Sequence, residues 1–134
     1  MNEKGFYKMR LLATVIVWVF GSIAAWAQSI DGNALMEMCE GSSEAESAFC
    51  WGYVFGANDG GMYTALEVLQ KTNDGKVPST AEISSLLGYC TPNAVTSQQM
   101  VDIFVSYLRE NPERRHQPAQ VLFTNAMTDA FPCR

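Results

Sequence analysis

The stretch "TSQQMVDIFVSYLRENPERRHQPAQVLFTNAMTDAFPC", residues 96–133, decides the fold class of this chain. Apolar side chains recur in it at helical spacing in two separate runs. The first run is Met100, Ile103, Phe104, Tyr107 and Leu108, and the second is Ala119, Leu122, Phe123, Ala126, Met127, Ala130 and Phe131. Spacing of i, i+3, i+4 and i+7 is typical of the buried stripe of an amphipathic helix. The stretch therefore predicts two helices whose stripes form core.

Between these two runs lies the only histidine of the chain, His116. The preceding residues Asn111-Pro112-Glu113 resemble a helix start, with an N-cap, a proline at the first position and an acidic first turn. Pro118 starts the next helix, so His116 falls in a tight helical connector. Its neighbours Arg114 and Arg115 disfavour a charged imidazolium. We therefore expect a structural or surface position for His116, and not a general base.

Three further helices are predicted upstream, at residues 31–40, 44–71 and 79–87. Asp31 is a suitable N-cap for the first helix, since its carboxylate accepts bonds from free backbone amides. Capping boxes are predicted at Ser43/Glu46, Ser79/Glu82 and Thr96/Gln99. No run has the alternation of a strand. The fold class is therefore all-α: a compact bundle of about four main helices plus short helical turns.

Three glycines recur at every fourth position of the second predicted helix: Gly52, Gly56 and Gly60. Each costs roughly 0.8–1.0 kcal/mol of helix propensity relative to alanine, so the stripe calls for a compensating gain. We expect another helix to pack closely against it. A kink at Asn58-Asp59-Gly60-Gly61 is the alternative.

The first 27 residues have the three parts of a cleaved signal peptide: a basic start, the apolar run "LLATVIVWVF" and the small-residue exit Ala25-Trp26-Ala27. A transmembrane anchor is the alternative, but the apolar run is shorter than the ~20 residues a spanning helix needs. The domain is then residues 28–134. It holds 6 Lys and Arg against 13 Asp and Glu, a net charge of 6 − 13 = −7. This charge argues against nucleic acid and anionic membranes as partners, and would favour encounter with a basic one.

All four cysteines lie in this domain, at positions 39, 50, 90 and 133. An even number in a small exported domain predicts two disulfides. A zinc site is the alternative, but the cysteines lack the close pairs that zinc sites use. Consecutive helices joined by short turns lie antiparallel, so the end of one meets the start of the next. Of the three connectivities, the helix order favours Cys39–Cys50 and Cys90–Cys133.

Enzymatic chemistry is not indicated. The thiols are expected to be oxidised, and no nucleophile elbow, metalloprotease or phosphate-loop motif occurs. The sequence therefore predicts no catalytic residue, no metal and no cofactor.

The ordered set "GNALMEMC", "FCWGYVFGANDG", "YCTPNAVTSQQMVDIFVSYLRENPERRHQPA" and "DAFPCR" resembles the Rap/Tai family over roughly residues 32–134. These are immunity proteins against peptidoglycan amidase effectors of type VI secretion systems. The resemblance implies an exported, helical, disulfide-bonded inhibitor in the periplasm that occludes the active site of its effector. It leaves a homodimer open. The alternative is an orphan periplasmic module of the same fold, acting as an envelope accessory protein or an HdeA-like chaperone.

The resemblance transfers no binding residue, because the matched motifs are mostly cysteines, glycines and apolar positions that support the fold. Recognition often resides in exposed loops on a rigid scaffold. The clearest loop is "TNDGKVPST", residues 72–80, with turn residues at its centre and a proline that ends the helix. We therefore expect partner contacts at Asn73, Asp74, Gly75, Lys76 and Val77.

Overall fold

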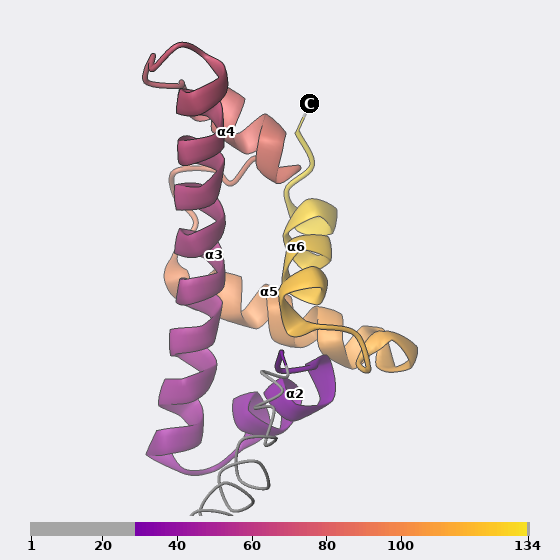
Figure 1. The fold of residues 1–134 in the computed structure, drawn as a ribbon. Helices are drawn as coiled ribbons and strands as arrows, with labels where there is room; N and C mark the ends of the chain where they lie inside the picture. Colours follow the sequence, from indigo (N-terminus) through magenta and orange to yellow (C-terminus); the bar gives the residue numbers. More distant parts are fainter. Residues whose placement is uncertain (1–28, 134) are drawn as a thin grey trace, which may run out of the picture.

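The computed structural model describes residues 29–133, so the signal peptide predicted for residues 1–27 lies outside the described residues. Within residues 29–133 the chain forms helices and no strand. They are α2 (Gly32–Glu40), α3 (Glu44–Thr72), α4 (Thr80–Leu87), α5 (Ser97–Glu110), the 3-10 helix η1 (Pro112–Arg114) and α6 (Ala119–Ala130), labelled as in Figure 1. The all-α class is confirmed, and the helices begin and end close to the predicted positions.

Local capping interactions explain where the helices begin. The three predicted capping boxes are all present, at the starts of α3, α4 and α5. In each, the N-cap side chain accepts a bond from a backbone N–H three residues on, and that residue's side chain accepts one from the N-cap backbone. Asp31 caps α2 by accepting from the backbone N–H of Ala34, at 2.8 Å. At the other end of α4, Gly88 has the left-handed conformation typical of a glycine after a helix.

The core lies where α5 and α6 pack together. The phenyl rings of Phe104 and Phe123 meet edge to face, with their centroids 5.7 Å apart, and both residues are fully buried. Helices α5 and α6 supply ten of the fifteen residues of the buried cluster, including Val101 and Val105, which the predicted stripe of α5 did not contain, and α2 and α3 add residues such as Leu35 and Val54. Ala130 of the predicted stripe of α6 is exposed, because it lies at the end of that helix.

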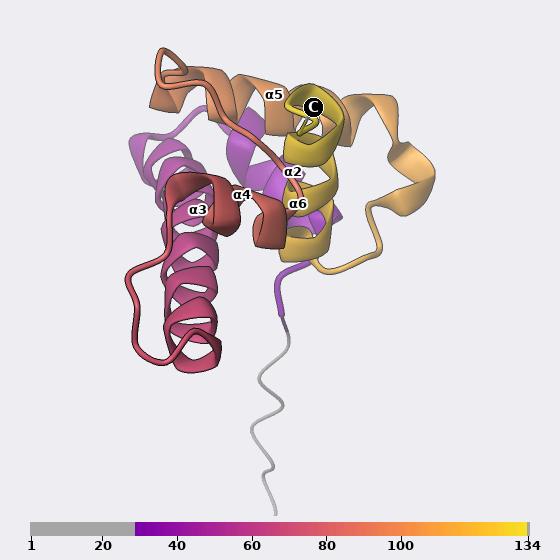
Figure 2. The ribbon, with the colours of Figure 1, turned by 90° about the horizontal axis from the view of Figure 1, so that it is seen from above.

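Helices α3 and α5 each contact most of the other helices. Figure 1 shows α3 along one side of the molecule and α6 along the other. Helix α4 lies between the far end of α3 and the C-terminal segment that follows α6. Seen from above, α5 crosses one side of the molecule (Figure 2). The structure pairs the cysteines as the helix order predicts. Cys39–Cys50 joins the end of α2 to the start of α3, and Cys90–Cys133 joins the connector after α4 to the segment after α6.

The connector that holds His116 binds the N-terminus of α2. The backbone N–H groups of Gly32 and Asn33 donate to the carbonyls of Gln117 and Arg115, each at 3.1 Å. These bonds satisfy two of the amides that a helix start leaves free. His116 itself is exposed in this connector, so the predicted surface position is confirmed.

Asn111 occupies the expected N-cap position of η1, but it does not cap this helix through its side chain. Its side chain makes no capping bond to η1, and its Nδ2 instead donates to the carbonyl of Tyr107 at 2.9 Å, at the end of α5. The expected proline at the first position of η1 is present. Asn111 therefore serves the helix before it, because the last carbonyls of α5 also need donors.

The expected close packing against the glycine stripe is wrong. A methyl group built at Gly52, Gly56 or Gly60 would meet no atom within 4 Å. The stripe therefore faces open space, and no other helix of residues 29–133 covers it. The alternative, a kink at Asn58-Asp59-Gly60-Gly61, is not seen either, because α3 is one continuous helix from Glu44 to Thr72 and runs straight in Figure 1.

Candidate partner-binding surface

The loop expected to contact a partner, residues 73–77, has a defined conformation set by its own backbone. Asp74 and Gly75 both have positive φ, 52° and 78°, which reverses the chain directly after α3. The N–H of Gly75 donates to the carbonyl of Gln70 at 2.9 Å, and the N–H of Lys76 donates to that of Asn73 at 3.1 Å. The loop is therefore ordered before any partner arrives.

This loop presents an apolar side chain to solvent. Val77 is 80% exposed, the largest exposed fraction among the large hydrophobic residues of the described chain. The next residue, Pro78, is buried and fixes the end of the loop against the scaffold. An exposed branched side chain between Lys76 and the buried Pro78 is a surface that an interaction partner can cover.

The other exposed apolar side chains cluster in the same part of the chain. Seven large hydrophobic residues are exposed in residues 29–133, and six of them lie between positions 49 and 86: Phe49, Met62, Tyr63, Val68, Val77 and Leu86. Scattered exposed apolar residues are ordinary, whereas a contiguous patch of them marks an interaction surface, and Val68 and Leu86 lie together in the lining of one groove. Helix α3 is the main source, since only three of its 29 residues are buried.

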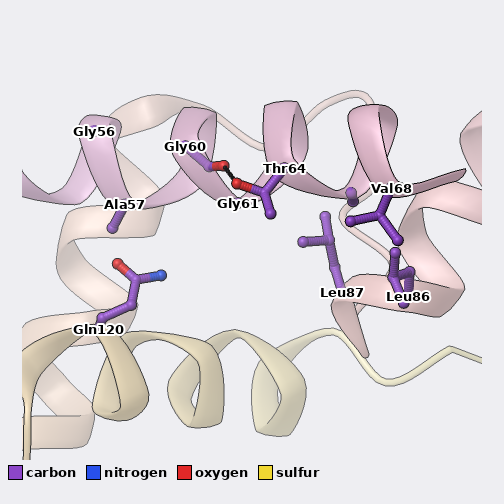
Figure 3. A pocket seen from close by; sticks show the side chains of 10 residues that line it. Gly56, Ala57, Gly60, Gly61, Thr64, Val68, Leu86, Leu87 and Gln120 are labelled. Carbon is purple, nitrogen blue, oxygen red and sulfur yellow. Dashed lines mark hydrogen bonds between the residues drawn. The ribbon is translucent and has the colours of Figure 1, made fainter. Parts of the chain in front are cut away.

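An open groove of about 490 Å³ runs between α3, α4 and α6. Figure 3 shows α3 along one edge, with Gln120 of α6 projecting toward Ala57 from the other and the leucines of α4 at one end. The groove is mainly apolar, because glycine, alanine, valine and leucine form most of its lining. Its lining residues are Gly56, Ala57, Gly60, Gly61, Thr64, Ala65, Val68, Leu86, Leu87 and Gln120.

Polar atoms in this groove are few. The hydroxyl of Thr64 donates to the carbonyl of Gly60 at 2.7 Å, so it is already used within α3. Gln120 is exposed and offers an amide donor and acceptor to a partner. A second depression, lined by Leu69, Ala81, Glu82, Ser85 and Leu86, shares Leu86 with the groove.

Glu82 places a negative charge at this second depression. Its carboxylate accepts hydrogen bonds from the hydroxyl and the backbone N–H of Ser79, both at 2.7 Å. The hydroxyl bond, followed by the backbone bond, holds the pKa of Glu82 below its ordinary value. The carboxylate is therefore ionised at neutral pH.

The described residues show no cluster that could hold a metal. No group of three or more His, Cys, Asp or Glu side chains is positioned for a metal ion within residues 29–133. In the same range, no helix is both long and apolar enough to cross a membrane. All four cysteines are joined in disulfides, so none of them is a free thiol.

The groove was not predicted from the sequence, although one signal pointed to it. A helix that is apolar on most of its circumference is normally covered on every side. The sequence of α3 has this pattern, and the expectation drawn from its glycine stripe was that another helix packs against it. The structure shows that α3 keeps one apolar side uncovered.

Residues 29–133 thus define a small all-α protein, joined by two disulfides, that presents an ordered loop and an apolar groove along α3 and α4. Residues 31–133 match the family model of the Rap1a immunity proteins. The match covers most of the chain, so the chain belongs to this family. A comparison with curated proteins gave no match, and neither did a comparison with solved structures. Membership in an immunity protein family implies binding to a partner effector, and with the disulfides it is consistent with an extracytoplasmic location.

Proposed function

We propose that this chain is a periplasmic immunity protein that binds and inhibits a peptidoglycan amidase effector of a type VI secretion system. The observation that carries the proposal is the family match over residues 31–133. Inhibition of this kind requires a stable surface and no catalytic group, so the chain acts stoichiometrically and not as an enzyme.

The scaffold suits an inhibitor that works outside the cytoplasm. The two disulfides would each stabilise the fold by roughly 3–4 kcal/mol in the chain-entropy model, which is a large share of the stability of a small domain. A signal peptide at residues 1–27 would deliver the chain to the periplasm, where disulfides form. Its acidic domain would speed encounter with a basic effector.

The loop of residues 73–77 is our candidate for the first contact with the effector. Its backbone is fixed by one hydrogen bond to Gln70 of α3 and one within the loop, so little conformational entropy is lost when it binds. Val77 is the side chain that a pocket on the effector would cover, since it is the most exposed large hydrophobic residue described.

The decisive experiment pairs the chain with an effector. The proposal requires a small amidase with a Cys–His pair encoded beside the gene for this chain. That amidase, directed to the periplasm, should lyse cells unless this chain is exported with it, and the purified chain should inhibit peptidoglycan cleavage at one-to-one stoichiometry. A purified pair that neither binds nor inhibits would refute the proposal. Protection of unrelated proteins at about pH 2–3 would instead favour the chaperone function.

The contact at the loop has its own test. Val77→Asp should weaken binding about tenfold or more without altering the melting temperature, because the side chain is exposed and contributes little to the fold. Ala45→Asp is the matched control. Ala45 is also exposed, and the substitution adds the same charge in the first turn of α3, roughly 40 Å from the loop. If exchange of residues 72–80 leaves binding unchanged, the loop is not the interface.

A further inference from the structure

The groove between α3, α4 and α6 has the features of a second docking site, separate from the loop. It is hollow and mainly apolar, and two of the exposed large hydrophobic residues, Val68 and Leu86, line it. Burial of such surface by a partner is favourable at roughly 25 cal/mol per Å² of apolar area.

The wall formed by α3 lets a partner approach the helix closely. Gly56 and Gly60 carry no side chain, and the space beside each is open. On the opposite side, Gln120 offers both a donor and an acceptor to a peptide group. An apolar segment with its own backbone groups fits these surroundings, because apolar contacts and a polar anchor are both available.

The charge around the groove decides between a second copy of this chain and a different partner. The stretch from Gly56 to Leu87, which contains the part of the groove lining that comes from α3 and α4, has four acidic and two basic residues, a net charge of −2. Two copies meeting through this face would bring like charges together, which is unfavourable. A segment with lysine or arginine would instead face opposite charges such as Glu82 at the adjoining depression.

We propose that this groove receives an apolar segment of the effector flanked by lysine or arginine residues. The inference rests on the proposed function, since it names the second surface through which the same effector is held. The groove and the loop then border the same helix, α4, and bind different parts of one partner.

A pair of glycine variants distinguishes the contribution of the groove to binding from that of the rest of α3. Gly60→Leu places a side chain at the groove, whereas Gly52→Leu adds the same side chain to the same stripe of the same helix, outside the groove lining. The Cβ atom of either leucine would meet no other atom within 4 Å. Both variants should therefore fold, and circular dichroism should show unchanged helicity. If Gly60→Leu fails to fold, Gly56→Leu replaces it, because Gly56 also lines the groove.

Binding is measured by calorimetry with the adjacent amidase, its catalytic cysteine replaced by alanine, at low and high salt. We expect Gly60→Leu to weaken binding about tenfold or more, Gly52→Leu to leave it unchanged, and wild-type binding to weaken as salt rises. Equal binding by wild type and Gly60→Leu, or a loss confined to Gly52→Leu, would overturn the inference and leave the proposed function intact. Absence of wild-type binding would overturn the proposed function itself. Light scattering that shows a wild-type dimer and a Gly60→Leu monomer would assign the groove to a second copy and overturn the inference.

Discussion

Gly60→Ala should make this protein more stable. A methyl group at position 60 would meet no atom within 4 Å, and the backbone there is ordinary helix. The substitution therefore gains helix propensity without a steric cost. Alanine is favoured over glycine in a helix interior by roughly 0.8–1.0 kcal/mol, which in a domain of this size raises the melting temperature by about 4 °C. The hydrogen bond that the Thr64 hydroxyl donates to the carbonyl of residue 60 is unaffected, because the acceptor is a backbone oxygen that the substitution does not change.

Gly32→Ala is the opposite case in the same molecule and serves as the control. A methyl group at Gly32 would clash with Leu122 Cδ1 and lie 2.9 Å from the backbone oxygen of Arg115. That oxygen also accepts the N–H of Asn33, so it cannot withdraw without loss of a hydrogen bond. Overpacking of this kind costs about 1–3 kcal/mol.

Both variants are compared with wild type by urea denaturation followed by circular dichroism, at low and high protein concentration. The expected order of stability is Gly60→Ala above wild type above Gly32→Ala. A loss of stability for Gly60→Ala at every concentration would refute the reasoning, because it would show that another part of the chain covers the stripe. A loss that appears only at high concentration would show that a second copy covers it.

Three further outcomes are expected. Replacing both Cys90 and Cys133 by serine should lower the free energy of unfolding by about 4 kcal/mol, since their separation of 43 residues closes a long loop, and urea titration measures it. Leu122→Ala should cost about 2–5 kcal/mol in the same assay, because Leu122 is fully buried. The pKa values of Glu46 and Glu82 are lowered in the fold, chiefly by the hydroxyl of the N-cap serine. Their contribution to stability is thus complete above their unfolded pKa and lost as the pH falls through the folded pKa, and Glu82→Gln should flatten the pH dependence of the urea midpoint below about pH 4.

The helices and their starts could be predicted because their determinants are close together in the sequence. A capping box joins residues three apart, as in Ser43 and Glu46, and an amphipathic stripe repeats within two turns. The cysteine pairing also followed from helix order, since Cys39 and Cys50 lie on either side of one short turn. The loop at residues 73–77 was recognisable from its turn residues, and its role in binding stays a prediction.

The glycine stripe could not be interpreted correctly from the sequence, because its meaning depends on what lies beside it. The spacing of Gly52, Gly56 and Gly60 is the same whether a helix covers them or solvent does. The same limit applies to the groove. Its walls come from α3, α4 and α6, and residues as far apart as Ala57 and Gln120 face each other across it.

The sequence by itself determined that this chain is all-α, where its helices begin, how its cysteines pair and which family it resembles. Each of these follows from interactions within a few residues or from the order of elements. Only the tertiary structure decided that the connector around His116 caps α2, that one side of α3 is uncovered, and that an apolar groove lies beside it. The physical reason is that a buried surface needs a neighbour, and that neighbour comes from a distant part of the chain, as Gln117 does for Gly32.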